Sequence, residues 1–233
     1  MRKILLLSFS VLCLGSQFTK AQNLGSLLKT VTSKTSSKST NNNLTESEAN
    51  SGVKELLSTG LVNSVTALNK TDAFWKSAYK ILLPEPLHTA DGVLRKLNMG
   101  GVADSAELRM NRAAEQAVGF AKPIFVNAIK QMTLTDAIKL VNGGNNSITD
   151  FFRAKTHDTL VNAFMPTIQT ELNKNKATSS YSQLVTKYNA VPFVKKANPD
   201  LSSYVAGKAV DALFDQISVQ EKKHKNESSS TDN

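Results

Sequence analysis

Two Glu-x-x-His pairs, Glu85–His88 and Glu221–His224, are the most enzyme-like feature of this chain. Ferritin-like di-iron bundles hold their metal with two such pairs and with further glutamates from facing helices. Here Glu85 stands between two prolines, and the second pair lies in a lysine-rich stretch whose positive charge opposes a metal ion. We therefore expect no metal site and no cofactor.

A row of polar residues has the spacing that places side chains on one face of a helix. Glu107, Asn111 and Glu115 follow one another at four-residue intervals, Arg112 lies beside them, and alanines flank the row. Three interpretations are open: a solvated face with ordinary ion pairs, a buried structural network, or a reactive site. The small neighbours favour a close contact between helices.

The segment "VNGGNNSITDFF" (residues 141–152) could bind an anion or could only separate two helices. Free N–H groups at a helix start attract phosphate or carboxylate. However, no strand precedes the glycines and no lysine follows them, and Asp150 would repel an anion. Helix punctuation is favoured: Gly143 as a left-handed cap of one helix, with Ser147 and Asp150 as the capping box of the next.

We expect the two polar groups to meet, with Arg112 or Arg153 pairing with a carboxylate of the other segment. No other catalytic set stands out, and His157 is predicted to be a surface side chain in a long helix. The candidate binding residues are Glu107, Asn111, Arg112, Glu115, Gly143, Gly144, Thr149, Asp150 and Arg153.

The elements that position these residues are helices. Between residues 45 and 224 the apolar spacing is helical almost throughout, without a period-two run typical of a strand. This predicts an all-α fold: one compact domain of about seven to nine helices with no sheet. The expected helices are 45–69, a helix to 97 stopped by Gly100-Gly101, 104–120, 124–132, 133–142, 147–175 with a kink or break at Pro166, 180–190 and 201–223. Thr45 with Glu48 and Thr133 with Asp136 have capping-box spacing.

The N-terminus has the pattern of a targeting segment. Arg2 and Lys3 precede a short apolar stretch, which predicts a signal peptide over 1–21. Lipid attachment at Cys13, the only cysteine, is disfavoured because Leu12 precedes it where a small residue is needed. We expect a flexible polar spacer over 22–44, the helical domain over 45–225 and a disordered polar tail over 226–233.

The location of the charge bears on the choice of partner. The chain carries a formal +9, but residues 45–221 hold 19 Lys and Arg against 17 Asp and Glu. A nucleic-acid binder would carry its basic excess on the domain itself, so we expect no nucleic-acid partner. We also expect no membrane span in the mature chain, and a product in the bacterial periplasm or cell envelope.

Five stretches occur in an order that resembles a known family. They are "LLPEPL", "MNRAAE", "AKPIFVNAIKQMT", "GGNNSITDFFRAKT" and "KYNAVPFVKK", which lie between residues 82 and 196, and the match as a whole covers about residues 46–221. Together they resemble domain of unknown function family 4197, a family of exported bacterial proteins. The resemblance implies an all-helical exported domain without an established activity. This chain has Asn145 and Asn146 where the family usually has Asp and Thr, and His88 where it usually has Gln.

The leading hypothesis is a non-catalytic binding module for an apolar ligand or a protein partner in the cell envelope. It predicts an apolar pocket with few polar groups. The alternatives are an enzyme that uses Glu107, Glu115 and Asp150, which predicts a cleft of ionisable groups with shifted pKa values, and a purely structural envelope protein. The sequence names neither the partner nor the oligomeric state.

Overall fold

The computed structural model describes residues 46–174, 176–198 and 200–230, and within them it contains eight α-helices and no strand. The predicted all-α class is therefore confirmed. The expected signal peptide, the spacer and Thr45 lie outside the described residues. The helices are α2 (Glu46–Leu68), α3 (Asp91–Lys96), α4 (Gly100–Val118), α5 (Ala121–Gln131), α6 (Leu134–Asn142), α7 (Ser147–Lys174), α8 (Ala177–Asn189) and α9 (Leu201–Ser230).

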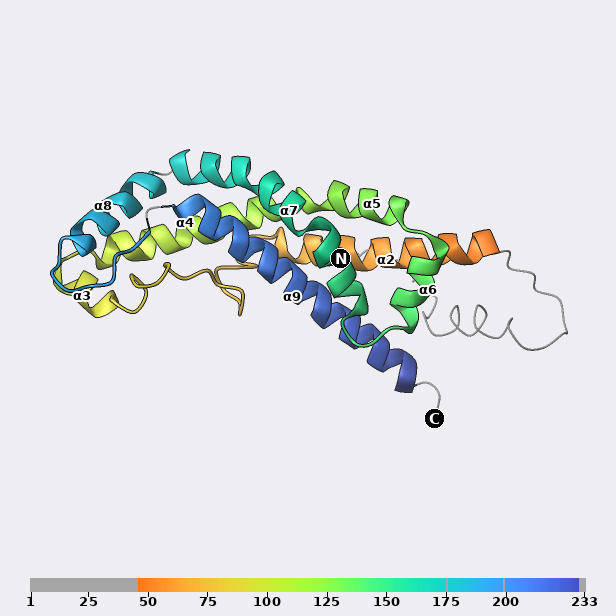
Figure 1. Cartoon of the computed structure of the whole chain (residues 1–233). Coiled ribbons are helices and arrows are strands. Elements are labelled where there is room, and N and C mark those ends of the chain that lie inside the picture. Colours follow the sequence, from red (N-terminus) through yellow and green to blue (C-terminus); the bar gives the residue numbers. More distant parts are fainter. Residues whose placement is uncertain (1–45, 175, 199, 231–233) are drawn as a thin grey trace, which may run out of the picture.

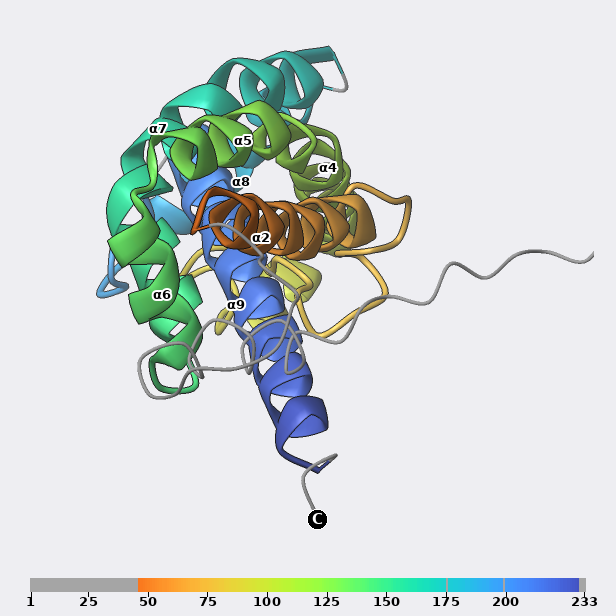
Figure 2. The same ribbon diagram turned by 90° about the vertical axis from the view of Figure 1, so that its right-hand side faces the viewer.

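The helices form an elongated bundle (Figure 1). α3 and α8 lie together at one end, and α6 lies toward the other. A view from that other end shows α5, α6 and α7 curving around α2 and α9 (Figure 2). Among the described residues, no helix combines the length and the hydropathy needed to cross a bilayer.

α4 lies at the centre of the bundle and packs against α7, α8 and α9. Its inner surface is made of buried alanines, including Ala106, Ala113 and Ala117. Because the distance between packed helices depends on the side chains at the contact, these small residues let three helices approach α4 closely. The predicted close contact beside the polar row is therefore present.

Three buried phenylalanines fill the space where α5, α7 and α9 meet. The Phe125 ring lies 6.0 Å from that of Phe152 and 6.2 Å from that of Phe214, and both pairs are edge-to-face. This arrangement places the positive ring edge against a negative ring face. The cluster fixes the start of α7 against α9, next to residues 143–146, which connect α6 to α7 and which we call the glycine loop.

The boundary between α3 and α4 differs from the sequence prediction. Gly100 and Gly101 begin α4 instead of stopping the preceding helix. α3 is ended by Asn98, whose left-handed backbone (φ 58°) lets the N–H of Met99 reach the carbonyl of Leu94. Asparagine tolerates this conformation almost as glycine does.

Of the two outcomes expected at Pro166, a kink or a break, the break does not occur: Pro166 lies inside α7, and Figure 1 shows α7 as one curved helix. A further difference concerns α9. α9 continues to Ser230, through residues 226–230 where we expected a disordered tail. By contrast, the capping box of Thr133 and Asp136 at the start of α6 is confirmed, with both reciprocal hydrogen bonds present.

Candidate functional site

The polar row on α4 binds the backbone of the segment between α2 and α3. Asn111, which is fully buried, accepts a hydrogen bond from the N–H of Ile81 at 2.8 Å. Its Nδ2 donates to the carbonyl of Ile81 at 2.8 Å and to that of Glu107 at 2.7 Å. Both amide donors are thus used within the chain.

Glu115, one turn further along α4, binds the start of the same segment. Its Oε1 accepts hydrogen bonds from the N–H groups of Phe74 at 3.1 Å and Trp75 at 3.3 Å. Its Oε2 accepts one from Arg112 at 2.8 Å, and Arg112 also pairs with Asp72 at 2.6 Å. These hydrogen bonds, first to Glu115 and then to Asp72, raise the pKa of Arg112 above its ordinary value.

Glu107 completes the row at its other end. Its Oε1 accepts from the N–H of Leu83 at 3.1 Å, and its Oε2 pairs with Lys80 at 3.1 Å. The segment 69–90 contains no α-helix, so its backbone N–H groups need other partners. Of the three interpretations left open by the sequence, the geometry of the row matches a buried structural network.

The glycine loop does hold an anion, and that anion belongs to the chain itself. The carboxylate of Glu221, a buried residue of α9, accepts hydrogen bonds from the N–H of Ile148 at 3.0 Å and the N–H of Thr149 at 2.9 Å. It also accepts from the hydroxyl of Thr149 at 2.7 Å. The first turn of α7 therefore receives its negative cap from another helix.

Lys225 binds the other side of this loop. Its ammonium donates to the carbonyls of Gly143 at 3.1 Å and Gly144 at 2.5 Å, and it pairs with Glu221 at 2.8 Å. Burial by itself raises the pKa of Glu221, but the hydrogen bonds from Lys225 and from the start of α7 outweigh burial and lower that pKa below its ordinary value.

The predicted roles of the loop residues need two corrections. Gly143 has φ −77°, so it is not a left-handed cap; a Cβ there would lie 2.5 Å from the Cβ of Ser147, so close packing requires the glycine. The capping box of Ser147 and Asp150 does not form. Ser147 is already helical and its hydroxyl donates to the carbonyl of Leu140 at 2.7 Å, while Asp150 is exposed.

The predicted ion pair between the two polar groups is also wrong. Arg112 pairs with Asp72 and Glu115, whereas Arg153 pairs with Asp211 at 3.1 Å and stacks on a phenylalanine of α9. Arg112 thus binds carboxylates of α4 and of the 69–90 segment, and Arg153 binds one of α9. The structure thus contains two separate polar networks, one between α4 and the 69–90 segment and one between α7 and α9.

The two Glu-x-x-His pairs lie in different environments. Glu85 is exposed in a turn and accepts a hydrogen bond from Thr89, whereas Glu221 is buried in the α7 cap. His157 is half-buried and contacts Asp158 at 2.9 Å. Within the part of the chain that the structure describes, no three His, Cys, Asp or Glu side chains are grouped as a metal ion would require.

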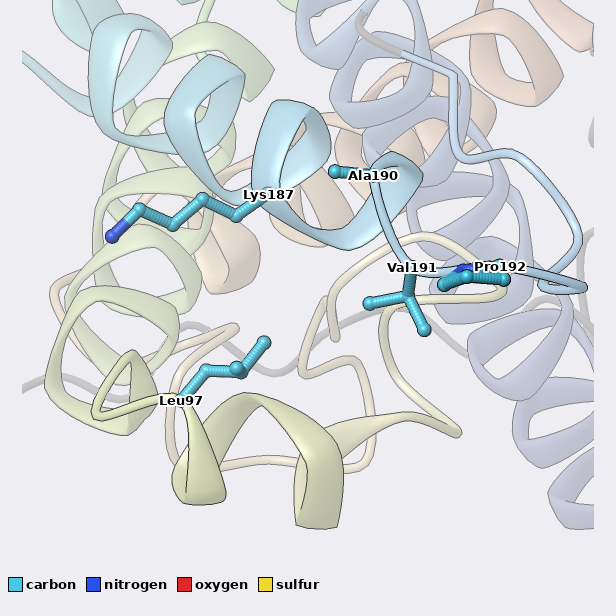
Figure 3. Close-up of a pocket in the computed structure, with 5 residues that line it drawn as sticks. All are labelled: Leu97, Lys187, Ala190, Val191 and Pro192. Atoms are coloured by element: carbon cyan, nitrogen blue, oxygen red, sulfur yellow. The ribbon is translucent and has the colours of Figure 1, made fainter.

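An apolar hollow, which the sequence analysis did not single out, lies at the α3–α8 end of the bundle (Figure 3). It has a volume of about 440 Å³, and Figure 3 shows Leu97 and Val191 extending into the same space. The residues that line it are Leu97, Lys187, Ala190, Val191 and Pro192. Its only charged lining group is Lys187.

Exposed apolar side chains also lie close in the chain to the residues that line this hollow. Phe193 follows the lining residue Pro192 and is completely exposed, at 108 % of the reference area, while Val93 and Leu97 are 42 % and 43 % exposed. We call Val93, Leu97, Val191, Pro192 and Phe193 the end face. Three of the five large apolar side chains that are exposed in the described part of the chain belong to the end face. Exposed apolar side chains are therefore clustered there and not distributed singly over the surface.

A second hollow, of about 300 Å³, lies between α9 and the 78–82 stretch. Burial raises the pKa values of Tyr79 and Tyr204, which line it. Their hydroxyls donate to Gln216 at 3.0 Å and to the carbonyl of Leu82 at 3.1 Å. A raised tyrosine pKa moves the hydroxyl away from loss of its proton at neutral pH, which is the opposite of what a general base requires.

Comparison with protein families gives one result. A family model described as "Protein of unknown function (DUF4197)" matches residues 43–233, which include every described helix. Comparison with curated proteins and with solved structures gives no match.

Proposed function

The chain belongs to the DUF4197 family of proteins of unknown function, which brings no activity with it, and we propose that it is a non-catalytic binding module. Its binding surface is the end face, and its partner presents an apolar group to the hollow beside Leu97 and Val191. We place this binding in the cell envelope, because the N-terminal sequence has the pattern of an export signal.

The observation that carries this proposal is the exposure of Phe193 beside an apolar hollow. A fully exposed phenylalanine gives up the favourable free energy of burial, which is about 1.5–3 kcal/mol for a side chain of this size. Covering Phe193 and Leu97 with a partner would recover part of that free energy. The hollow is within the lower range of volumes found for small-molecule sites.

The polar candidate residues also support a non-catalytic function, because their side chains are already bound within the chain. Asn111, Glu115 and Glu221 are buried, and their polar atoms bind backbone N–H groups or fixed cations of the chain. A reactive carboxylate must instead reach a substrate in a cleft. We therefore assign these three buried polar groups to the stability of the fold and place recognition at the end face.

A fluorescent anionic dye, 8-anilinonaphthalene-1-sulfonate, tests the proposed surface in the absence of any natural partner. We expect the dye to bind with enhanced emission, and Phe193→Ser and Leu97→Ser to reduce that emission. Phe120→Ser is the matched control, because Phe120 is also exposed (51 %) but lies at the α4–α5 junction. Equal emission from all variants would contradict the proposal.

Native mass spectrometry of the protein isolated from its own cells gives an independent test. A bound apolar molecule or partner that is retained by the wild type and lost in Phe193→Ser would support the proposal. Retention of the same mass by both proteins would assign the binding to another surface.

A further inference from the structure

We propose that the end face docks onto the surface of an anionic lipid membrane. Phe193 enters the boundary between headgroups and acyl chains, and the surrounding lysines contact lipid phosphates. This inference rests on the proposed function, because it names the partner of the same surface. It requires no helix that crosses the bilayer.

The charge around the end face favours an anionic partner. Residues 172–199, which include α8 and the chain after it, contain five lysines and no aspartate or glutamate. Lys187 lines the hollow, and Lys195 and Lys196 follow Phe193 closely in the chain; all three are exposed. Lys96, also exposed, precedes Leu97 on the α3 side. This is a local basic surplus, unlike the near-balanced charge of the domain as a whole.

The carboxylates close to this surface in sequence already have partners. Asp91 and Asp104 both pair with Arg95, at 2.7 Å and 3.1 Å. Asp200 accepts a hydrogen bond from the N–H of Ser203 at the start of α9, at 3.1 Å. Arg95 thus offsets part of the negative charge of Asp91 and Asp104, whereas Asp200 keeps its charge at the start of α9.

The backbone at Phe193 presents its ring to the outside. Phe193 has φ 62°, a left-handed conformation that is unfavourable for a bulky residue and common for glycine or asparagine. The ring contacts almost nothing in the chain, because its exposure is complete. An aromatic ring flanked by lysines matches the composition of the membrane–water interface, where aromatic and basic side chains are enriched.

Two other occupants fit the same observations less well. A second copy bound through the same face would bring lysines against lysines, which opposes association. A stable protein partner usually covers about 800 Å² on each side with a shaped surface. The end face offers five apolar side chains around a protruding ring, and a membrane accepts such a group without shape complementarity.

A tryptophan placed at the proposed insertion point tests this inference directly. The full chain carries Trp75→Phe, which removes the only tryptophan, together with Phe193→Trp. We expect a blue shift of its emission, and quenching by brominated acyl chains, with vesicles of phosphatidylcholine and phosphatidylglycerol. Phe120→Trp in the same background should show neither effect. Because the signal comes from one position, association through the N-terminal segment does not mimic it.

Lysine variants in this background test the electrostatic part. The triple substitution of Lys96, Lys187 and Lys195 to Gln should weaken vesicle association by about a hundredfold, since each lysine near an anionic surface contributes about fivefold. The triple substitution of Lys122, Lys130 and Lys155 to Gln changes the total charge equally elsewhere and should have little effect. Circular dichroism confirms that both variants are folded.

The outcomes separate the two proposals. Absence of a blue shift at position 193, an equal shift with pure phosphatidylcholine, or equal losses in both lysine variants would each overturn membrane docking. If the dye nevertheless binds the end face in the wild type, the binding function stands and its partner is a protein or a free ligand. If neither dye nor vesicles bind there, both proposals fail.

Discussion

The side-chain amide of Asn111 hydrogen-bonds to both the N–H and the C=O of Ile81, at 2.8 Å each. Ile81 lies in an irregular segment, and Asn111 supplies the two partners that a neighbouring β-strand would otherwise provide. Glu115 and Glu107 do the same for the N–H groups of Phe74 and Leu83. One face of α4 thus replaces the missing secondary structure of its neighbour.

Replacing this amide should lower the stability of the fold. Asn111→Leu keeps the approximate shape but leaves the buried backbone groups of Ile81 without partners, which should reduce the free energy of unfolding by about 2–4 kcal/mol. Urea unfolding followed by circular dichroism measures the change. Asn127→Leu on the exposed face of α5 is the control and should change stability by less than about 0.5 kcal/mol. A similar effect of both substitutions would argue against the role assigned to Asn111.

Glu221 should make the fold sensitive to acid. Its pKa in the folded state lies below the ordinary value of 4.5. The carboxylate therefore stabilises the fold fully above the pKa of the unfolded state, and this contribution is lost as the pH falls through the pKa of the folded state. Glu221→Gln should therefore cost about 1–2 kcal/mol at neutral pH and progressively less in acid. Urea unfolding from neutral pH down to about pH 3 measures the difference between the two proteins. Glu55→Gln, an exposed control, should leave the wild-type pH profile unchanged; a constant gap for Glu221→Gln would contradict the linkage.

The two adjacent glycines of the loop should respond differently to the same substitution. In Gly143→Ala the new Cβ would lie 2.5 Å from the Cβ of Ser147 and 2.9 Å from the carbonyl oxygen of Lys139, so the loop must move. We expect a loss of about 1–3 kcal/mol. Gly144→Ala meets nothing within 4 Å and should be nearly neutral. Thermal unfolding compares the pair, and equal melting temperatures would show that the tight packing is not required.

Stability and binding should change in opposite directions at Phe193. Phe193→Asn removes a bulky residue from a left-handed backbone conformation without losing a packed side chain, which should stabilise the fold by about 1 kcal/mol. The same variant should lose dye emission at the end face. Phe120→Asn, at a position with φ −73°, should gain no such stability. Thermal unfolding and dye titration on the same samples check both halves, and a destabilised Phe193→Asn would show that the ring packs in solution.

The polar row shows what the sequence could predict and where prediction stopped. The four-residue spacing of Glu107, Asn111 and Glu115 beside alanines predicted polar groups on one face and favoured a close helix contact. Their partners are mostly backbone N–H groups of residues 74–83. Every non-proline residue carries the same N–H, so such a partner leaves no signature in the sequence. Because these backbone partners could not be foreseen, we expected Arg112 to pair with a carboxylate of the segment 141–152, and that prediction was wrong.

The α7 cap was missed although a signal for it exists. Val210, Phe214, Ile217 and Glu221 repeat at intervals of four, three and four residues, so Glu221 continues the buried stripe of α9. Lys225 follows one turn later as its ion-pair partner. Read as part of that stripe, Glu221 is a buried carboxylate in need of a donor, and a helix start supplies donors. In the sequence analysis, the lysines around it served only as an argument against a metal ion.

The end face was not predicted because no pattern in the sequence brings residues 93–97 and 191–193 together. Their proximity follows from how α3 and α8 are placed at one end of the bundle, which depends on long-range packing around α4. The stretch "KYNAVPFVKK" marked the family resemblance, but its spacing did not indicate that Phe193 is exposed.

The two polar networks differ in how far apart their members lie along the chain, and this bears on the order of assembly during synthesis. The row on α4 joins residues 24 to 41 positions apart, whereas the bond from Thr149 to Glu221 joins residues 72 positions apart. A nascent chain that has reached the end of α4 already contains both sides of the first network. The start of α7, in contrast, keeps its N–H groups solvated until the last turns of α9 have left the ribosome.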